Sequence, residues 1–196
     1  ETTTGRLIMQ YASENLIPVT LELGGKSPMI VFSDCDFEKT VAGALTSMRF
    51  TRQGQSCTAA SRIYVERPIH DRFVEAMKRA VDGMVMGDPL DEKTDIGTII
   101  SQGQLDKVRG FIEEGRNTEG ATAHVCSAMP QDGGLKKGLF VQPVIFTGLP
   151  RDSRLVREEI FGPVTVIAPF DDPEAVLEEA NDSEYGLAAS LWTNNL

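Results

Sequence analysis

A cysteine in a short loop of small residues is the sharpest candidate for chemistry in this sequence. Cys57 follows a glycine-containing loop at residues 53–55, and small residues come directly after it. Small neighbours would let a substrate carbonyl approach the sulfur and the adjacent backbone N–H groups, which are the donors that an oxyanion needs. A free cysteine is more often a small buried hydrophobic residue, and this segment alone leaves both interpretations open.

A glutamate in an apolar run is the second candidate. Residues 21–28 read Leu-Glu-Leu-Gly-Gly-Lys-Ser-Pro and place Glu22 between two leucines. A carboxylate in an apolar strand is unfavourable unless it is paired or functional. The two glycines would allow another chain or a ligand to approach closely. Partial burial would strengthen Glu22 as a general base, and the alternative is a structural salt bridge to Lys26 or Arg62.

Two adjacent carboxylates before a Phe-Gly-Pro sequence form the third candidate. Residues 158–164 read Glu-Glu-Ile-Phe-Gly-Pro-Val. This pattern indicates a loop with one exposed acid and an aromatic ring, Phe161, presented to a ligand. The alternative for Phe161 is a place in the hydrophobic core, which is the common location of a phenylalanine.

The composition is that of a soluble globular protein. Of 196 residues, 41% are hydrophobic and 24% are charged, which excludes a disordered, collagen-like or disulfide-scaffold chain. The formal net charge of −10 gives no counterion-release gain, so we expect no nucleic-acid partner. No apolar run reaches the roughly 18 to 20 residues that span a bilayer, and no signal peptide is visible. We therefore expect no membrane partner.

The cysteines and histidines indicate reduced thiols and no metal. Cys35, Cys57 and Cys126 form no CxxC pair, and an odd count without a secretory signal suggests a cytoplasmic location. His70 and His124 lie far apart without the spacing of metal ligands, so no metal site is expected.

Alternating strand and helix patterns predict an α/β domain with an open, mostly parallel sheet flanked by helices. The 3.6-residue periodicity predicts helices over 3–16, 37–50, 69–84, 101–114 and 173–181. Apolar runs between turn signals predict strands over 19–23, 28–32, 62–66, 121–126, 164–170 and 187–192, with a loop over 128–138. Residues 139–147 contain either a strand pair or one strand broken at Pro143. Glu22 would then lie within a strand, and Cys57 in a loop.

Together the three segments resemble the aldehyde dehydrogenase superfamily in residues and in order. The shared patterns are residues 21–28, Phe-x-x-x-Gly-Gln-x-Cys-x-Ala at 50–59 and Glu-Glu-Ile-Phe-Gly-Pro at 158–163. Residues 181–192 are similar to the family's Asn-x-x-x-Tyr-Gly-Leu-Ala-Ala stretch. The resemblance covers essentially the whole chain and implies the Rossmann-like catalytic domain of that family.

The resemblance implies oxidation of an aldehyde substrate to a carboxylic acid with NAD or NADP. Cys57 would attack the aldehyde carbon as a thiolate, and its backbone N–H would help to hold the oxyanion. After hydride transfer, Glu22 would activate the water that hydrolyses the thioester. The presence of this glutamate favours hydrolysis over transfer of the acyl group to coenzyme A.

The resemblance also assigns residues to the cofactor. Glu159 would hydrogen-bond the nicotinamide-side ribose, and Phe161 would pack near the nicotinamide ring. Leu23 and Gly24 would lie against the nicotinamide end, and Gln104 would sit near the cofactor. For Lys26 the resemblance assigns no such role, and a structural one is expected.

Family members are more than twice as long as this chain. The resemblance therefore divides the chain into a remnant of the cofactor-binding domain at residues 1–23 and a catalytic domain at 24–196, truncated at its C-terminal end. We expect little or no dehydrogenase activity from such a fragment, and a homo-oligomeric parent protein. Two alternatives remain. One is a thiol-dependent esterase that uses Cys57 without a cofactor, and the other is a non-catalytic interaction domain.

Overall fold

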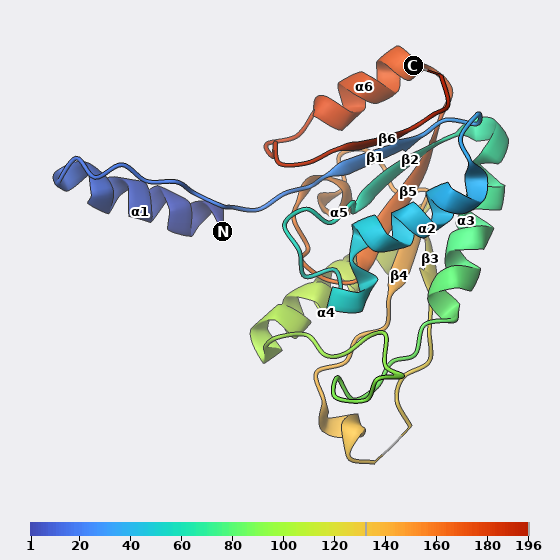
Figure 1. The fold of residues 1–196 in the computed structure, drawn as a ribbon, viewed down its shortest axis with the longest axis horizontal. Coiled ribbons are helices and arrows are strands. Elements are labelled where there is room, and N and C mark those ends of the chain that lie inside the picture. The colour runs from blue at the N-terminus through green and yellow to red at the C-terminus, as the bar shows by residue number, and fades with distance from the viewer. Residues whose placement is uncertain (132, 196) are drawn as a thin grey trace.

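A single six-stranded sheet organises the chain. The computed structural model describes residues 1–131 and 133–195, with strands in the order β3-β4-β5-β2-β1-β6 (Figure 1). All neighbouring strands are parallel except β3 and β4, so the expected open, mostly parallel α/β sheet is confirmed. The strands are β1 Pro28–Val31, β2 Arg62–Glu66, β3 Thr122–Val125, β4 Val144–Thr147, β5 Val164–Phe170 and β6 Ser190–Trp192.

The helices follow the predicted periodicity, with boundaries set by capping residues. Asp36, Ser101 and Asp172 each accept a hydrogen bond from a backbone N–H in the first turn of the helix that follows. A four-residue helix, α5, was not predicted. The helices are α1 Thr2–Glu14, α2 Phe37–Met48, α3 Arg67–Asp82, α4 Gln102–Arg116, α5 Arg154–Arg157 and α6 Pro173–Asn181.

The strand predictions hold only in part. The strand over 19–23 is wrong, because those residues pair with no other strand in the described part of the chain. At 139–147 the break at Pro143 is confirmed, because β4 begins directly after this residue, which has no N–H to donate, and residues 139–143 form no strand of their own. The strand over 187–192 is confined to β6, which pairs only with Met29–Val31. Asp132, in the loop predicted over 128–138, and Leu196 lie outside the described residues.

Side chains that alternate along the strands build cores on both faces of the sheet. On one face Met29, Ile63 and Ile167 pack in a cluster with α2 and α3. On the other face Ile30 and Tyr64 pack with α6, and a further cluster joins α4 and α5 to β4 and β5. The central strands are therefore fixed from both sides, and the loops at their ends start from rigid positions.

Helix α1 stands apart from this body on an extended segment (Figure 1). Gly5 is its only buried residue, and a Cβ at that position would press on the Leu23 side chain. Leu7, Ile8 and Tyr11 are 46%, 42% and 67% exposed. Helix α1 thus presents apolar side chains that no part of the described chain covers.

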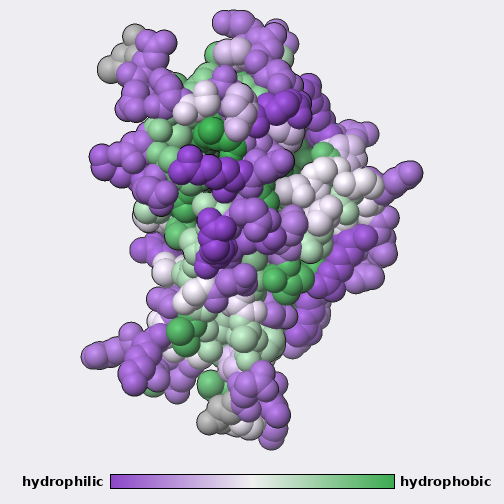
Figure 2. All heavy atoms as spheres, turned by 90° about the vertical axis from the view of Figure 1, so that its right-hand side faces the viewer, coloured by the Kyte–Doolittle hydropathy of each residue, from purple (hydrophilic) through white to green (hydrophobic). Residues whose placement is uncertain are grey.

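One face of the molecule is mostly polar. Figure 2, which views the molecule from the right-hand side of Figure 1, shows a largely hydrophilic face with small, separate hydrophobic patches. Among the described residues, no helix has the length and apolar character needed to cross a bilayer. Nor do the histidine, cysteine and carboxylate side chains of residues 1–131 and 133–195 gather into a group of three that could hold a metal ion.

Replacing a buried leucine of α4 should show how much this core contributes. Leu105 is 2% exposed in the α4 cluster, whereas Leu90 is 91% exposed in a loop. We expect Leu105→Ala to lower the free energy of unfolding by about 2 to 5 kcal/mol through lost burial and a cavity. Leu90→Ala should change it by less than about 0.5 kcal/mol. Urea denaturation measures both, and equal effects would contradict this packing.

Candidate active site

The three motif segments meet at the amino ends of parallel strands. Arg62 in β2 is in register with Pro28 of β1 and with Val166 of β5. Each motif segment lies immediately before one of these three strands. Because parallel strands begin at the same edge of a sheet, segments more than a hundred residues apart in sequence converge there.

The predicted site residues all line one cavity of about 830 Å³. They are Glu22, Leu23, Gly24, Cys57, Gln104, Glu159 and Phe161. The cavity has further lining residues for which the motifs gave no signal, among them Ile100, Ser101, Gly103 and Lys107 around the start of α4. The N-terminal end of α1 contributes Glu1. The volume of this cavity is within the range of small-molecule and cofactor pockets.

The loop that carries Cys57 is held in shape by left-handed backbone and close packing. Arg49, Gln53 and Gly54 have positive φ angles of 58°, 54° and 63°. A Cβ at Gly54 would collide with the carbonyl oxygen of Gly162, so only glycine fits there. Two residues before Cys57, the side chain of Gln55 accepts a hydrogen bond from the Ile100 N–H at 3.0 Å.

Cys57 itself is half-buried and free, and it faces the cavity. A fully buried thiol, the alternative open from the sequence, is therefore not what the fold produces. Within the described residues the Cys57 backbone N–H donates no hydrogen bond, although Ser56 and Ala59 on either side do donate. That N–H is available to an oxygen atom bound next to the sulfur.

Glycines 24 and 25 bring the glutamate, cysteine and Glu-Glu segments into contact. The Gly25 N–H donates to Oε1 of Glu159 at 3.1 Å. A Cβ at Gly24 would collide with the Glu159 carboxylate, and one at Gly25 would collide with the Cys57 carbonyl oxygen. Glu159 is half-buried, whereas Glu158 is exposed and pairs with Arg154 at 2.7 Å. The prediction of one exposed acid in this loop is confirmed.

Glu22 differs from the prediction in its surroundings. It is exposed at the cavity and lies in the extended segment between α1 and β1, not inside a strand. Neither of the predicted salt-bridge partners contacts it, because Lys26 Nζ has no hydrogen-bond partner and Arg62 donates to backbone carbonyls and Tyr64. The Glu22 carboxylate is therefore free to meet water or substrate.

Phe161 is held in a strained backbone conformation at the cavity wall. Its φ angle is +56°, uncommon for a residue with a large side chain. The Gln104 amide donates to the carbonyl oxygens of Ile160 and Phe161, both at 2.9 Å. Phe161 lines the cavity rather than the core, and Gln104 anchors its loop, a contact that the sequence did not indicate.

Lys26, directly behind this site, is 2% exposed. Burial is the main reason that its pKa is lowered to about 7, and the nearby Arg62 lowers it further. Glu159 and Glu158 oppose this shift, and Lys107 adds weakly to it. The ammonium group has no hydrogen-bond partner among the described residues.

The fold agrees with comparisons to known proteins. The model of the aldehyde dehydrogenase family matches residues 1–196, and the chain belongs to that family. It is 43% identical over 193 residues to a betaine aldehyde dehydrogenase of Brucella anthropi. It is also 43% identical over 197 residues to a 2-aminomuconic 6-semialdehyde dehydrogenase of a Pseudomonas species.

Solved structures show the same fold. An NAD+ complex of aldehyde dehydrogenase from Bacillus cereus superposes with a TM-score of 0.91 at 40% identity over the whole chain. An NAD+ complex of betaine aldehyde dehydrogenase from Staphylococcus aureus gives 0.90 at 37% identity over 98% of the chain. The chain spans only about 39% of the length of the relatives that it matches.

The close approach at Gly25 leads to a prediction with a matched control. Gly25→Ala should lower the free energy of unfolding by about 1 to 3 kcal/mol, because its Cβ would collide with the Cys57 carbonyl oxygen. Gly103 lines the same cavity, but nothing lies within 4 Å of the Cβ it would gain. Gly103→Ala, in the first turn of α4, should leave stability unchanged or raise it. If denaturation shows that Gly25→Ala and Gly103→Ala lose similar amounts of unfolding free energy, the close approach of Gly25 to the Cys57 carbonyl is wrong.

The buried Lys26 predicts a specific pH dependence of stability. Its pKa is about 7 in the folded chain and about 10.4 when unfolded, so between these values the unfolded chain binds more protons. Stability should therefore rise with pH in this window, by up to about 1.4 kcal/mol per pH unit. Lys26→Met should remove the rise, and Lys93→Met, at an exposed loop position, should keep it. Parallel urea titrations from pH 7 to 9 test this, and identical slopes would contradict it.

Proposed function

We propose that this chain carries the catalytic machinery of an NAD(P)-dependent aldehyde dehydrogenase that oxidises an aldehyde to a carboxylic acid. The observation that carries the proposal is the convergence of Cys57, Glu22 and Glu159 on one cavity. The relatives support it, since they are named for the oxidation of betaine aldehyde and of a semialdehyde. The NAD+ complexes of similar structures support the choice of cofactor.

In this mechanism Cys57 is the nucleophile. Its thiolate attacks the aldehyde carbon and forms a thiohemiacetal, while the unpartnered Cys57 N–H faces the developing oxyanion. Ser56 lines the cavity beside the sulfur and would contact the substrate. After oxidation the acyl group stays on the sulfur as a thioester.

Glu22 acts as the general base in the second half of the reaction. The exposed carboxylate in the same cavity can take a proton from a water molecule, and that water attacks the thioester carbon. The carboxylic acid leaves, and the Cys57 sulfur is regenerated. Hydrolysis rather than transfer to coenzyme A follows from the presence of this base.

The nicotinamide end of the cofactor fits the wall formed by Leu23, Gly24, Glu159 and Phe161. Because Gly24 has no side chain, the Glu159 carboxylate can reach the backbone here, where it would accept hydrogen bonds from a ribose. The bound NAD or NADP supplies the hydride acceptor. Gln104 lies at the same wall and keeps the Phe161 loop in place.

We further propose that residues 1–23 belong to the cofactor-binding domain and residues 24–196 to the catalytic domain of a longer, homo-oligomeric, cytoplasmic protein. The separate position of α1 and its contact through Gly5 with Leu23 support this division. The length of the relatives supports the longer protein. Three free cysteines support a reducing compartment.

A thiol esterase activity is the second candidate, because Cys57 faces the cavity and ester cleavage by a thiolate needs no cofactor. We expect the chain to cleave 4-nitrophenyl acetate and to form an acetyl adduct on Cys57, detectable by mass spectrometry. Cys57→Ala should reduce turnover at least about 100-fold, while Cys35→Ala should leave it unchanged. Unaltered turnover in Cys57→Ala would exclude Cys57 as the nucleophile.

The chain by itself should show little or no dehydrogenase activity. Losing a single oxyanion donor already lowers the rate by a factor of about 10² to 10³. The loss of most of a cofactor-binding domain should lower the rate further. Absorbance of NADH or NADPH should therefore stay at background with aliphatic and aromatic aldehydes. A clear, Cys57-dependent signal would contradict the domain division proposed above.

A further inference from the structure

A second cavity, of about 310 Å³, is lined by the residues that directly follow Gly24 and Gly25 in the sequence. Lys26, Ser27 and Arg62 line it, together with Tyr185 and the loop at residues 186–189. It shares no lining residue with the cavity that contains Cys57. The two cavities are thus separate, although the segment from Gly24 to Ser27 passes along both.

Two buried polar groups beside this cavity have no partner. Lys26 is 2% and Ser27 is 4% exposed, and neither Lys26 Nζ nor Ser27 Oγ makes a hydrogen bond within the described chain. A buried polar group without a hydrogen bond is unfavourable, and a buried charge without a partner is more so. The Lys26 ammonium can only donate and the Ser27 hydroxyl can donate as well as accept, so an acceptor would serve both groups.

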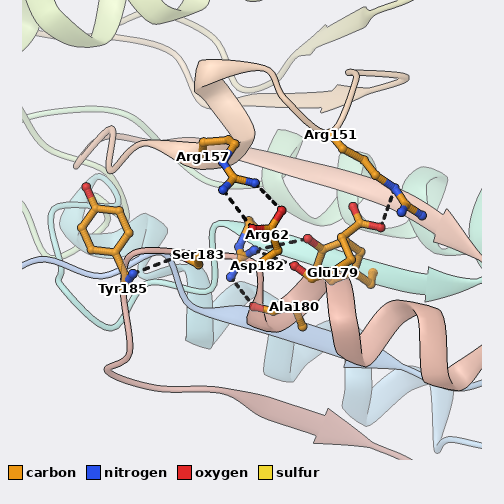
Figure 3. Close-up of polar contacts among 9 residues, drawn as sticks. Arg62, Arg151, Arg157, Glu179, Ala180, Asp182, Ser183 and Tyr185 are labelled. Atoms are coloured by element: carbon orange, nitrogen blue, oxygen red, sulfur yellow. Dashed lines mark hydrogen bonds and ion pairs between the residues drawn. The ribbon is translucent and has the colours of Figure 1, made fainter.

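Arg62 adds a second buried cation without a carboxylate. It is 4% exposed, and its guanidinium donates at 2.9 Å to the carbonyl oxygen of Ala180 (Figure 3) and at 2.9 Å to that of Lys26. Its remaining acceptors, a carbonyl and the Tyr64 hydroxyl, are also neutral and lie at 3.4 Å. No salt bridge of Arg62 exists within the described residues.

The acidic groups near Arg62 are engaged elsewhere. Glu179 pairs with Arg151 at 2.8 Å, and Asp182 pairs with Arg157 at 2.6 Å (Figure 3). Both carboxylates therefore already have a cation. Neither Lys26 nor Arg62 therefore pairs directly with a carboxylate among the described residues, although Glu159 and Glu158 act on Lys26 at longer range.

We propose that this cavity is a binding site for a small monocarboxylate anion, held by Lys26, Ser27 and Arg62. One carboxylate oxygen accepts hydrogen bonds from the Lys26 ammonium and the Ser27 hydroxyl, and the other faces the Arg62 guanidinium. A single negative charge is favoured, because Glu158 and Glu159 lie close enough to Lys26 to act on it and would repel a dianion. A cavity of this volume accommodates a short carboxylate.

A carboxylate bound in this cavity would oppose the causes that lower the pKa of Lys26. Burial and Arg62 disfavour its charged form, while Glu159 and Glu158 favour it only in part. A bound carboxylate would restore the charged form, so binding should be accompanied by proton uptake near neutral pH. Residues 186–189, which line the cavity, are exposed and belong to no helix or strand.

The test is a titration of the 196-residue chain at pH 7 with sodium acetate replacing sodium chloride at constant ionic strength. Binding is followed by the melting temperature and by the 13C line width of carboxylate-labelled acetate. We expect a saturable rise in melting temperature in the unmodified chain. Lys26→Met should abolish it, and Ser27→Ala should weaken binding about three- to tenfold, as expected of one lost hydrogen bond. Lys93→Met, at an exposed loop position, should leave acetate affinity within about twofold.

Three results would overturn the proposal. They are a response to acetate that does not saturate, equal acetate binding by Lys26→Met, and tighter binding of inorganic phosphate than of acetate. Lys26→Met nearly preserves side-chain length and removes an unpartnered charge, so it should fold. Ser27→Ala retains both cations and supplies an independent measurement. None of these results depends on dehydrogenase or esterase activity, so the anion site is tested independently of the function proposed above.

Discussion

The close approach of three chain segments at Gly24 and Gly25 is the constraint on which the rest of the site depends. One side chain atom at either position would displace the Glu159 carboxylate or the Cys57 carbonyl. With no side chain there, the Gly25 N–H reaches Glu159, and the cysteine loop packs directly on the glutamate segment. Lys26, which follows Gly25 directly, is buried, and its ammonium group has no hydrogen-bond partner among the described residues.

Rigid strands and strained loops together position the residues that line the cavity. Strands β1, β2 and β5 are buried on both faces and run parallel in a defined register, which fixes where each loop starts. The loops then depart from regular structure, with left-handed backbone at Gln53 and Phe161 and the Gln104 amide holding the second of these. Backbone strain at a cavity wall is typical of functional sites, where the surrounding structure enforces it.

Local patterns in the sequence predicted the sheet class and most helices, and the family resemblance supplied most of the predicted cavity residues. The apolar runs at 62–66 and 164–170 were clear enough to define β2 and β5. The exposure of Glu22, the anchoring by Gln104 and the burial of Lys26 could not be predicted, because each depends on partners far away in sequence. The apolar run at 19–23 resembles a strand, but no other described strand pairs with it.

The most direct test of this account is the alkylation rate of each cysteine at neutral pH, resolved by mass spectrometry. Cys57 faces the cavity and is half-buried, as is Cys35, while Cys126 is 1% exposed with its pKa raised to about 11 by burial and by Asp82. If Cys57 is an accessible nucleophile, it should react at least about tenfold faster than Cys35, and Cys126 should be slowest. A Cys57 that reacts no faster than Cys35 would contradict the central claim.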